Sequence, residues 1–271
     1  MTSTLCYALD PVRWAADKFS FFCDPWQAQV LRSNKNLILN ASRQSGKSTV
    51  CGLTALHRGI YFPNSLILVA SPSIRQSSEL FKKISNGIHQ LGIRSDLLED
   101  NRTSCTMANG SRIISLPGDE KYIRGFSGVN LLLLDEASRI PDELFYGVSP
   151  MLSVSKGRMV MLSTPFGKRG VFHQQWTEGG DAWERIEIPA SLCPRISQAF
   201  LEEERKTIGE WWFAQEYLCT FTETTDQVFS YADVNAALSD DIAPLFPVHS
   251  RADSEILSTT LQPLFRIGGK S

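Results

Sequence analysis

The chain lacks long hydrophobic runs and an N-terminal targeting segment. Its uninterrupted apolar runs reach only about five residues, far short of the roughly 20 that a membrane-spanning helix needs. The N-terminal segment MTSTLCYALDPVRWAADKF does not show the basic-then-apolar order of a signal peptide. The sequence therefore predicts a cytoplasmic protein with no membrane partner.

The cysteines form no metal or redox motif. None of the six belongs to a Cys-x-x-Cys pair or to a Cys/His zinc pattern. This favours free thiols in a reducing compartment. The six are Cys6, Cys23, Cys51, Cys105, Cys193 and Cys219.

The chain also has little net charge, because 27 Lys and Arg residues oppose 29 Asp and Glu residues and leave −2 at pH 7. This argues against a protein that coats DNA by bulk charge, although it allows a local basic groove. The hydrophobic fraction of 42% and the charged fraction of 21% exclude a disordered chain. The 271 residues fit one large α/β domain, alone or with a small extension.

What the sequence does contain is an alternation of short apolar segments with longer mixed segments. Continuous apolar strands separated by helices are typical of a mostly parallel sheet covered on both faces. We expect buried strands at residues 36–41, 65–70, 130–134, 158–162 and 183–188. The Asn109-Gly110 turn predicts a hairpin of residues 103–107 with residues 112–116. We expect helices at residues 46–59, 72–91 and 197–217.

Two of these helices carry a predicted apolar face. In the helix at 72–91 the face consists of Ile74, Leu80, Ile84, Ile88 and Leu91. In the helix at 197–217 it consists of Phe200, Leu201, Ile208, Trp212 and Tyr217. The pattern weakens beyond residue 227, so we expect one domain over residues 1–230 and a poorly specified tail over residues 231–271.

The first chemical signal is a candidate phosphate-binding loop, Ala41-Ser42-Arg43-Gln44-Ser45-Gly46-Lys47-Ser48-Thr49. It follows a predicted strand and opens a predicted helix, so its backbone N–H groups can cradle phosphate oxygens. Lys47 would reach the β and γ phosphates, and the Ser48 hydroxyl would hold Mg²⁺. Ala41 stands where the usual pattern has glycine, which is acceptable if its φ is negative. The alternative is an ordinary helix start with Ser45 as N-cap.

The second signal is an acidic pair at the end of the apolar run Leu131-Leu132-Leu133-Leu134. Ligands of parallel sheets bind beyond the carboxyl ends of the strands. Asp135 is therefore expected at the Mg²⁺, directly or through water, and Glu136 is expected to polarise the water that attacks the γ-phosphate. The alternative is that Asp135 only caps the following helix.

Together these segments resemble the ATPase domain of the large terminase subunit of tailed phages. The resemblance rests on SRQSGKST, on LLLLDEAS and on Leu162-Ser163-Thr164-Pro165-Phe166-Gly167, with the arginine inside the phosphate loop as its most distinctive feature. It extends from about Pro25 to Phe229. It implies a RecA-like P-loop NTPase with a central, mostly parallel sheet flanked by helices.

The same resemblance implies the activity and the partners. It implies Mg²⁺-dependent ATP hydrolysis that packages double-stranded DNA into a procapsid. It further implies a homo-oligomeric ring on a portal, a small terminase subunit as partner, and a phage or prophage gene expressed in a bacterial cytoplasm. Two rival functions stay open: a helicase-like DNA-stimulated motor and a non-catalytic ATP-binding regulatory module.

The resemblance also implies residue roles. Trp26 and Gln27 match an aromatic-Gln pair that contacts adenine, although a core tryptophan beside a solvated helix residue is the alternative. Ser163, Thr164 and Pro165 match a motif that couples hydrolysis to DNA, although a simple turn after the strand is the alternative. The full set expected to bind ATP is Trp26, Gln27, Ser42, Arg43, Gln44, Ser45, Gly46, Lys47, Ser48 and Thr49.

Two arginines compete to stabilise charge during the reaction. Arg43 lies in the loop and would act in cis, whereas Arg124 in Tyr122-Ile123-Arg124-Gly125 matches an arginine finger that enters the neighbouring subunit's site. We favour Arg124 as the trans finger and Arg43 as a phosphate-positioning residue; a surface ion pair is the alternative for Arg124.

The remaining segments are less specific. Residues 71–76 and 213–217 resemble other family segments, or simply pack, and Lys82, Lys83, Lys168 and Arg169 are candidate DNA contacts. Full-length large terminases carry a second, nuclease domain. Residues 231–271 show no strand pattern to hold its carboxylates, so we expect no nuclease activity.

Overall fold

The computed structural model describes residues 2–123, 125–223 and 237. The strands are β1 (Asn36–Ala41), β2 (Leu66–Ser71), β3 (Leu97–Asp100), β4 (Ser104–Met107), β5 (Arg112–Pro117), β6 (Val129–Asp135), β7 (Arg158–Ser163) and β8 (Trp183–Ile188). The helices are α1 (Thr2–Leu9), α2 (Pro11–Phe19), α3 (Pro25–Arg32), α4 (Lys47–Tyr61), α5 (Ile74–Gln90), α6 (Glu120–Ile123), α7 (Asp142–Ser155), α8 (Gly170–Glu178) and α9 (Gln198–Tyr217). Short 3₁₀ turns include η2 (Ala137–Arg139) and η4 (Ala190–Leu192).

The eight described strands form one sheet in the order β3-β4-β5-β2-β6-β7-β1-β8. In the part of this order that runs β5-β2-β6-β7-β1-β8, every neighbouring pair is parallel. The strands β3, β4 and β5 pair with one another antiparallel. The predicted α/β class, the parallel strands and the hairpin at Asn109-Gly110 are confirmed. The edge strand β3 and the helices α1 and α2 are additions that the sequence patterns did not predict.

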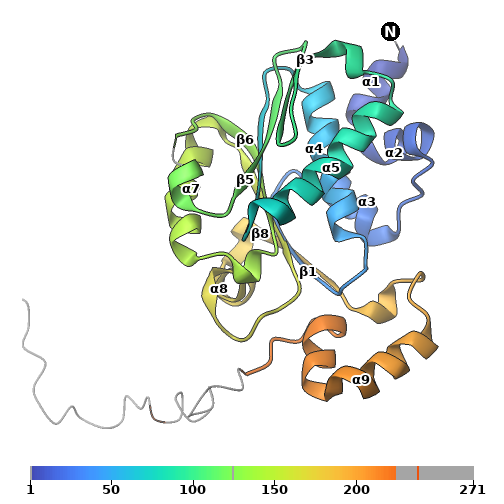
Figure 1. Ribbon diagram of the computed structural model, residues 1–271, viewed down its shortest axis with the longest axis vertical. Helices are drawn as coiled ribbons and strands as arrows, with labels where there is room; N and C mark the ends of the chain where they lie inside the picture. The colour runs from blue at the N-terminus through green and yellow to red at the C-terminus, as the bar shows by residue number, and fades with distance from the viewer. Residues whose placement is uncertain (1, 124, 224–236, 238–271) are drawn as a thin grey trace, which may run out of the picture. The chain divides into compact units, whose positions relative to one another are not determined.

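The central strands are apolar along their whole length because both faces of the sheet are covered. Alternate residues of β1 enter different cores: Leu37 and Leu39 pack with α4 and α5, whereas Ile38 packs with α7 and α8. Figure 1 shows these helix pairs on opposite faces of the sheet. On α5, Leu80, Ile84 and Ile88 are buried in the same core cluster as Leu37 and Leu39, as predicted. Ile74, which was also predicted on this face, is 46% exposed.

Polar side chains set the starts of several helices. Asp10 accepts hydrogen bonds from the backbone N–H groups of Val12 and Arg13, and Pro11 occupies the first turn of α2. At α3 the Asp24 side chain and the Gln27 side chain form a reciprocal capping box. The Ser73 hydroxyl caps α5 by accepting from the N–H of Gln76. These caps fix the residues at which α2, α3 and α5 begin.

Helix α9 differs from the predicted continuous helix because it breaks at Gly209, whose φ of 80° and ψ of 160° are not helical. The break changes the phase of the helix, so residues after it face differently from a continuous 3.6-residue repeat. Phe213 is therefore buried, and Trp212, which was predicted on the apolar face, is 46% exposed. Leu201 and Tyr217 are buried as predicted.

The predicted boundary at residue 230 and the tail at residues 231–271 lie outside the described residues, apart from the single position 237. All six cysteines are free thiols. None of the described helices combines the length and the apolar composition needed to cross a bilayer.

Candidate active site

The loop between β1 and α4 is the candidate phosphate-binding loop, and its backbone turns are compatible with that prediction. Gln44 and Gly46 take positive φ values of 58° and 95°, whereas Ala41 is not among the positive-φ residues, so the substitution of glycine by Ala41 fits. Gly46 is the N-cap of α4, and the Ser45 hydroxyl donates instead to the carbonyl of Ser42 at 2.9 Å. The alternative in which Ser45 caps the helix is therefore wrong.

The loop and the acidic pair meet at one edge of the sheet. Lys47 begins α4 and its side chain is largely buried, and its Nζ lies 3.7 Å from Oε1 of Glu136. The carboxyl ends of β1 and β6 are separated only by β7 in the sheet order. Two motifs that are far apart in the sequence thus form one site.

Asp135 is the last residue of β6 and is 7% exposed. Its Oδ1 accepts the backbone N–H of Glu136 at 3.1 Å. Burial raises the pKa of the Asp135 carboxyl to about 6, the Glu136 carboxylate adds to this, and Lys47 opposes it. Glu136 takes a positive φ of 52°, which turns the chain sharply after the strand. The N-cap of the following turn, η2, is Glu136, so Asp135 is not the cap of that turn.

The segment predicted to couple hydrolysis to DNA touches the acidic pair. Ser163 ends β7, and its Oγ lies 3.5 Å from Oε2 of Glu136 and 2.7 Å from the hydroxyl of Ser138. Thr164 and Pro165 follow it and are buried. This edge therefore holds Lys47, Glu136 and Ser163 in a connected row.

The predicted adenine pair is only partly near the loop. Gln27 is 2% exposed, its Oε1 accepts the N–H of Asp24 at 2.9 Å, and its Nε2 lies 3.3 Å from where a Cβ on Gly46 would be. Trp26 packs into the core cluster on the α4 side of the sheet. The structure thus brings Gln27, rather than the Trp26 ring, against the phosphate loop.

Arg43 contacts the end of α9. Its Nε donates to Oε2 of Glu216 at 2.7 Å, and its backbone N–H donates to the carbonyl of Glu216 at 3.0 Å. Arg139 of η2 lies 3.8 Å from the second oxygen of Glu216 and stacks 4.0 Å above the Phe166 ring. Glu216 itself is 6% exposed. One buried carboxylate thus joins the phosphate loop to the turn after the acidic pair.

Two further contacts join the C-terminal half of the chain to the site. Gln215 accepts the N–H of Gly167 at 3.3 Å, in the loop that follows Pro165. Arg195 donates through Nη2 to Oδ2 of Asp24 at 2.7 Å and to the carbonyl of Ser45 at 3.0 Å. Arg195 therefore ties the start of α3 to the phosphate loop.

Sequence reasoning did not assign a role to Glu216, Gln215, Arg139 or Arg195. The first two lie in the segment 213–217, which resembles a family segment or simply packs. The signal that could have identified them is a polar Gln-Glu pair inside an otherwise apolar stretch, since such residues are buried only with partners. Nothing in the local sequence distinguishes Arg139 or Arg195 from surface arginines.

The other candidate residues are dispersed. Ser48 and Thr49 lie half-buried in the first turn of α4, and Nζ of Lys83, a candidate DNA contact, lies 3.4 Å from the Thr49 hydroxyl. Lys83 is thus beside the phosphate loop. Arg169 lies 4.7 Å from the Phe166 ring, and Lys168 pairs with Glu223 at 3.5 Å. Arg124 lies outside the described residues.

One protein-family model matches most of the chain. The sequence model described as terminase large subunit, T4-like-virus type, N-terminal, matches residues 38–236. The large terminase ATPase domain of Thermus phage P74-26 is similar in structure, with a TM-score of 0.70 and 20% identity over 79% of this chain and 100% of that one.

The large terminase of a second, thermophilic bacteriophage is similar too. Its ADP complex gives a TM-score of 0.62 and 13% identity over 74% of this chain and 54% of that one. Its ATP-γ-S complex gives a TM-score of 0.57 and 15% identity over 73% of this chain and 52% of that one. The chain spans about half the length of that terminase. Because the family match covers most of the sequence, the chain belongs to the phage terminase large-subunit family and has the RecA-like fold of its DNA-packaging ATPase domain.

Proposed function

We propose that this chain hydrolyses ATP with Mg²⁺ and uses the energy to move double-stranded DNA into a viral procapsid. The observation that carries the proposal is the 3.7 Å contact between Lys47 and Glu136, because it joins the phosphate loop and the acidic pair in one site. Membership of the terminase family supports the DNA-packaging role. The ADP and ATP-γ-S complexes of the thermophilic phage terminase support the choice of an adenine nucleotide.

The donor set fits a divalent cation. Asp135 is a buried carboxylate, and no cation lies within ion-pair distance of it among the residues that the structure describes. A hard cation such as Mg²⁺ prefers carboxylate, hydroxyl and phosphate oxygens. We therefore assign Asp135 and the Ser48 hydroxyl to the metal. A bound metal would neutralise the charge that develops on the transferred phosphoryl group.

The protein residues divide the remaining work. Lys47 and the backbone N–H groups from Gln44 to Ser48 hold the phosphates, because the N–H groups of Ser42, Arg43 and Thr49 already donate to backbone carbonyls. Gln27 beside Gly46 reads the adenine edge. Glu136 orients and deprotonates the attacking water. Ser163 donates to the Glu136 carboxylate, so a movement of β7 would change the position of this base.

A second subunit would complete the charge stabilisation. We propose that Arg124 acts as a finger in trans and that Arg43 positions the phosphates in cis. This arrangement requires a ring, which would sit on a portal and work with a small terminase subunit inside the bacterial host. Family membership supports this part of the proposal, which rests on no contact in the described chain.

The test is phosphate release from Mg-ATP by the full chain, with and without linear duplex DNA, over a range of protein concentrations. Lys47→Ala and Glu136→Gln are compared with the wild type. Glu143→Gln is a matched control, because this carboxylate lies in the first turn of α7 rather than in the site. We expect both site variants to lose at least about 100-fold in rate and the control to keep it.

The concentration series separates the parts of the proposal. Specific activity that rises with protein concentration supports a site completed between subunits. Specific activity that is independent of concentration contradicts the trans role of Arg124 and favours Arg43. Tight ATP binding without hydrolysis, with DNA present, contradicts the motor and favours a nucleotide-binding module.

A further inference from the structure

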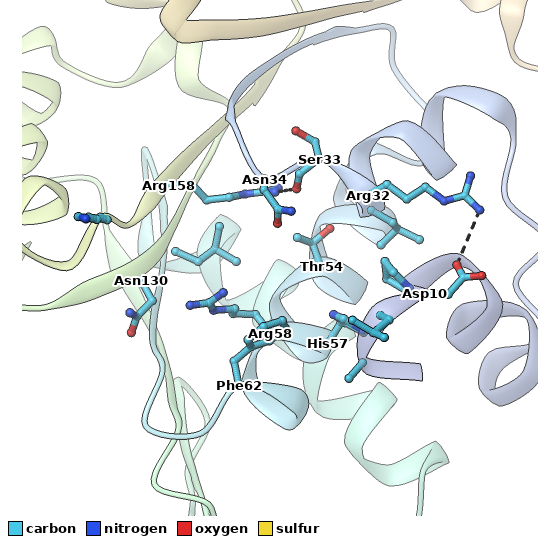
Figure 2. Close-up of a pocket in the computed structure, with 16 residues that line it drawn as sticks. Asp10, Arg32, Ser33, Asn34, Thr54, His57, Arg58, Phe62, Asn130 and Arg158 are labelled. Carbon is cyan, nitrogen blue, oxygen red and sulfur yellow. Dashed lines mark hydrogen bonds and ion pairs between the residues drawn. The ribbon is translucent and has the colours of Figure 1, made fainter. Parts of the chain in front are cut away.

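A pocket of about 720 Å³ lies at the amino ends of the central parallel strands, and the candidate active site lies at their carboxyl ends. Its lining residues come from the starts of β1, β6 and β7, from the last turns of α3 and α4, and from the junction of α1 with α2. Figure 2 shows Arg158 and Arg58 reaching into it from β7 and from α4. A concavity of about 300–1,000 Å³ is typical of small-molecule sites.

The pocket is strongly cationic. Arg32, Arg58, Lys156 and Arg158 line it, whereas Asp10 is the one carboxylate among its lining residues. That carboxylate lies 3.7 Å from Arg32, so the ion pair leaves the other three cations without a counter-charge in the lining. A site of this kind attracts an anion that carries more than one negative charge.

The lining histidine adds no charge at neutral pH. Nε2 of His57 lies 2.9 Å from the carbonyl of Tyr7. Burial of the ring lowers the pKa of His57 further below neutrality. The charge of the pocket therefore comes from its arginines and its lysine.

Buried donors in the pocket have no acceptor. Among the residues that the structure describes, Nε of Arg58 and both Nε and Nη2 of Arg158 are buried without a hydrogen-bond partner. Arg158 uses Nη1 on the carbonyl of Ser33, the C-cap of α3, and Arg58 stacks 4.4 Å from the Phe62 ring. Both guanidinium groups are thus held in place while donors stay unused. Buried charged donors without acceptors are costly, so they point to a missing ligand.

Protein groups nearby do not supply the missing acceptor. Glu184 is the acid whose charge acts on Arg158, but its two oxygens accept from Gln29 at 2.7 Å and Ser33 at 2.5 Å. Burial lowers the pKa of Arg158 to about 10, and the positive charge of Arg58 contributes in the same direction. A bound anion would relieve both effects.

We propose that this pocket binds a phosphate group through Arg58 and Arg158, with Lys156 and Arg32 at its rim. The planar fork of each guanidinium matches a phosphate, and a phosphate monoester carries nearly two negative charges at pH 7, whereas a carboxylate carries one. A free phosphorylated molecule supplies such a dianion, whereas the backbone of DNA supplies successive phosphodiesters that carry one negative charge each. The site is separate from the candidate active site, and the proposal does not depend on ATP hydrolysis.

The test measures binding of two probes to the full chain carrying Lys47→Ala, which weakens phosphate binding in the loop at the other edge. Calorimetry reports inorganic pyrophosphate, and fluorescence anisotropy reports a 30-base-pair duplex. Arg58→Gln and Arg158→Gln are the pocket variants. Arg94→Gln removes the same charge from an exposed ion pair with Asp100 and serves as the control. Thermal melting checks that each variant folds, and Arg58→Gln alone carries the test if the more buried Arg158 cannot be replaced.

We expect each pocket variant to weaken binding of one probe at least tenfold while Arg94→Gln leaves it unchanged. Loss of pyrophosphate binding identifies a free phosphorylated ligand, and loss of duplex binding alone identifies the DNA backbone. The proposal would be overturned if the pocket variants bound both probes as tightly as the protein with an intact pocket. It would also be overturned if Arg94→Gln weakened binding as much as the pocket variants do.

Discussion

At the scale of single residues, Glu216 is the point where contacts behind the phosphate loop converge. Its carboxylate is buried and accepts from Arg43 at 2.7 Å, and Arg139 lies 3.8 Å from its other oxygen. A buried carboxylate with two cationic partners differs from a surface ion pair, because little water competes for its oxygens. Glu216 therefore helps to fix the loop arginine in its present position.

Replacing Glu216 by glutamine should lower the free energy of unfolding by about 1–3 kcal/mol, the range for hydrogen bonds to charged groups. Glu210→Gln is the matched control, since Glu210 pairs with Arg205 at 3.0 Å but is 67% exposed in its side chain. The control should cost less than about 1 kcal/mol. Chemical denaturation measures both, and equal losses would show that Glu216 contributes no more than a surface pair.

Asp135 gives the candidate site a pH dependence. Its folded-state pKa of about 6 lies above its usual 3.8, because burial and Glu136 disfavour the ionised form. A raised pKa means that the native state binds the proton more tightly than the unfolded chain. The associated stability is fully present below about pH 4 and is lost as pH rises through about 6.

Asp135→Asn should therefore be more stable than the wild type at pH 8 in metal-free buffer. The expected difference is up to about 3 kcal/mol, from two pKa units at 1.36 kcal/mol each. It should shrink toward zero by about pH 4, where the wild-type carboxyl is protonated in the native state and no longer disfavours folding. Denaturant titrations at several pH values measure it. A difference that stays constant with pH would contradict the assigned cause.

At the scale of elements, the break in α9 sets which residues reach the site. Gly209 has φ 80° and ψ 160°, a region that is accessible essentially only to glycine. A Cβ built on it meets nothing within 4 Å, so strain rather than crowding opposes other residues. The break lets the last part of the helix turn Gln215 and Glu216 toward the phosphate loop and its neighbours.

Gly209→Ala should accordingly destabilise the protein by about 1–3 kcal/mol. In a continuous helix the same change would stabilise it by about 1 kcal/mol, so the sign of the effect is diagnostic. Gly52→Ala is the control, because Gly52 is inside α4 and its added Cβ would make ordinary contacts of 3.7–3.8 Å. Urea denaturation of both variants measures the signs; a stabilising Gly209→Ala would contradict the observed break.

The elements that sequence could predict are those with a strong local pattern. The strands from Asn36 and Trp183 were predicted to the residue, because each is a short apolar or alternating run between turn signals. The closeness of Lys47 to Glu136 was predictable because each follows a parallel strand, and the carboxyl ends of parallel strands lie on the same side of a sheet. These motifs carry their structural context within a few residues.

The remaining parts depend on contacts between distant segments. The break at Gly209 follows from tertiary packing, which a helical repeat does not encode. Arg195 and Glu216 reach the phosphate loop across separations of about 150 and 170 residues, as the positions of their partners Ser45 and Arg43 show. The proposed role of Arg124 depends on a neighbouring subunit, so one chain's sequence leaves both this role and the choice between Arg124 and Arg43 as predictions.

At the scale of the whole molecule, the two ends of the parallel strands carry different candidate sites. The carboxyl ends of these strands carry the candidate nucleotide site, and the opposite ends carry the cationic pocket around Arg58 and Arg158. Helix α4 runs between them, with Lys47 at its start and Arg58 in its last turn.

The central claim is that Lys47 holds the nucleotide and Glu136 performs hydrolysis in the same site. The most direct measurement mixes an excess of this chain with radiolabelled Mg-ATP and identifies the nucleotide that stays bound. We predict bound ADP for the wild type, intact bound ATP for Glu136→Gln and little bound nucleotide for Lys47→Ala. Intact ATP on the wild type, or ADP formed at the wild-type rate by Glu136→Gln, would contradict the account.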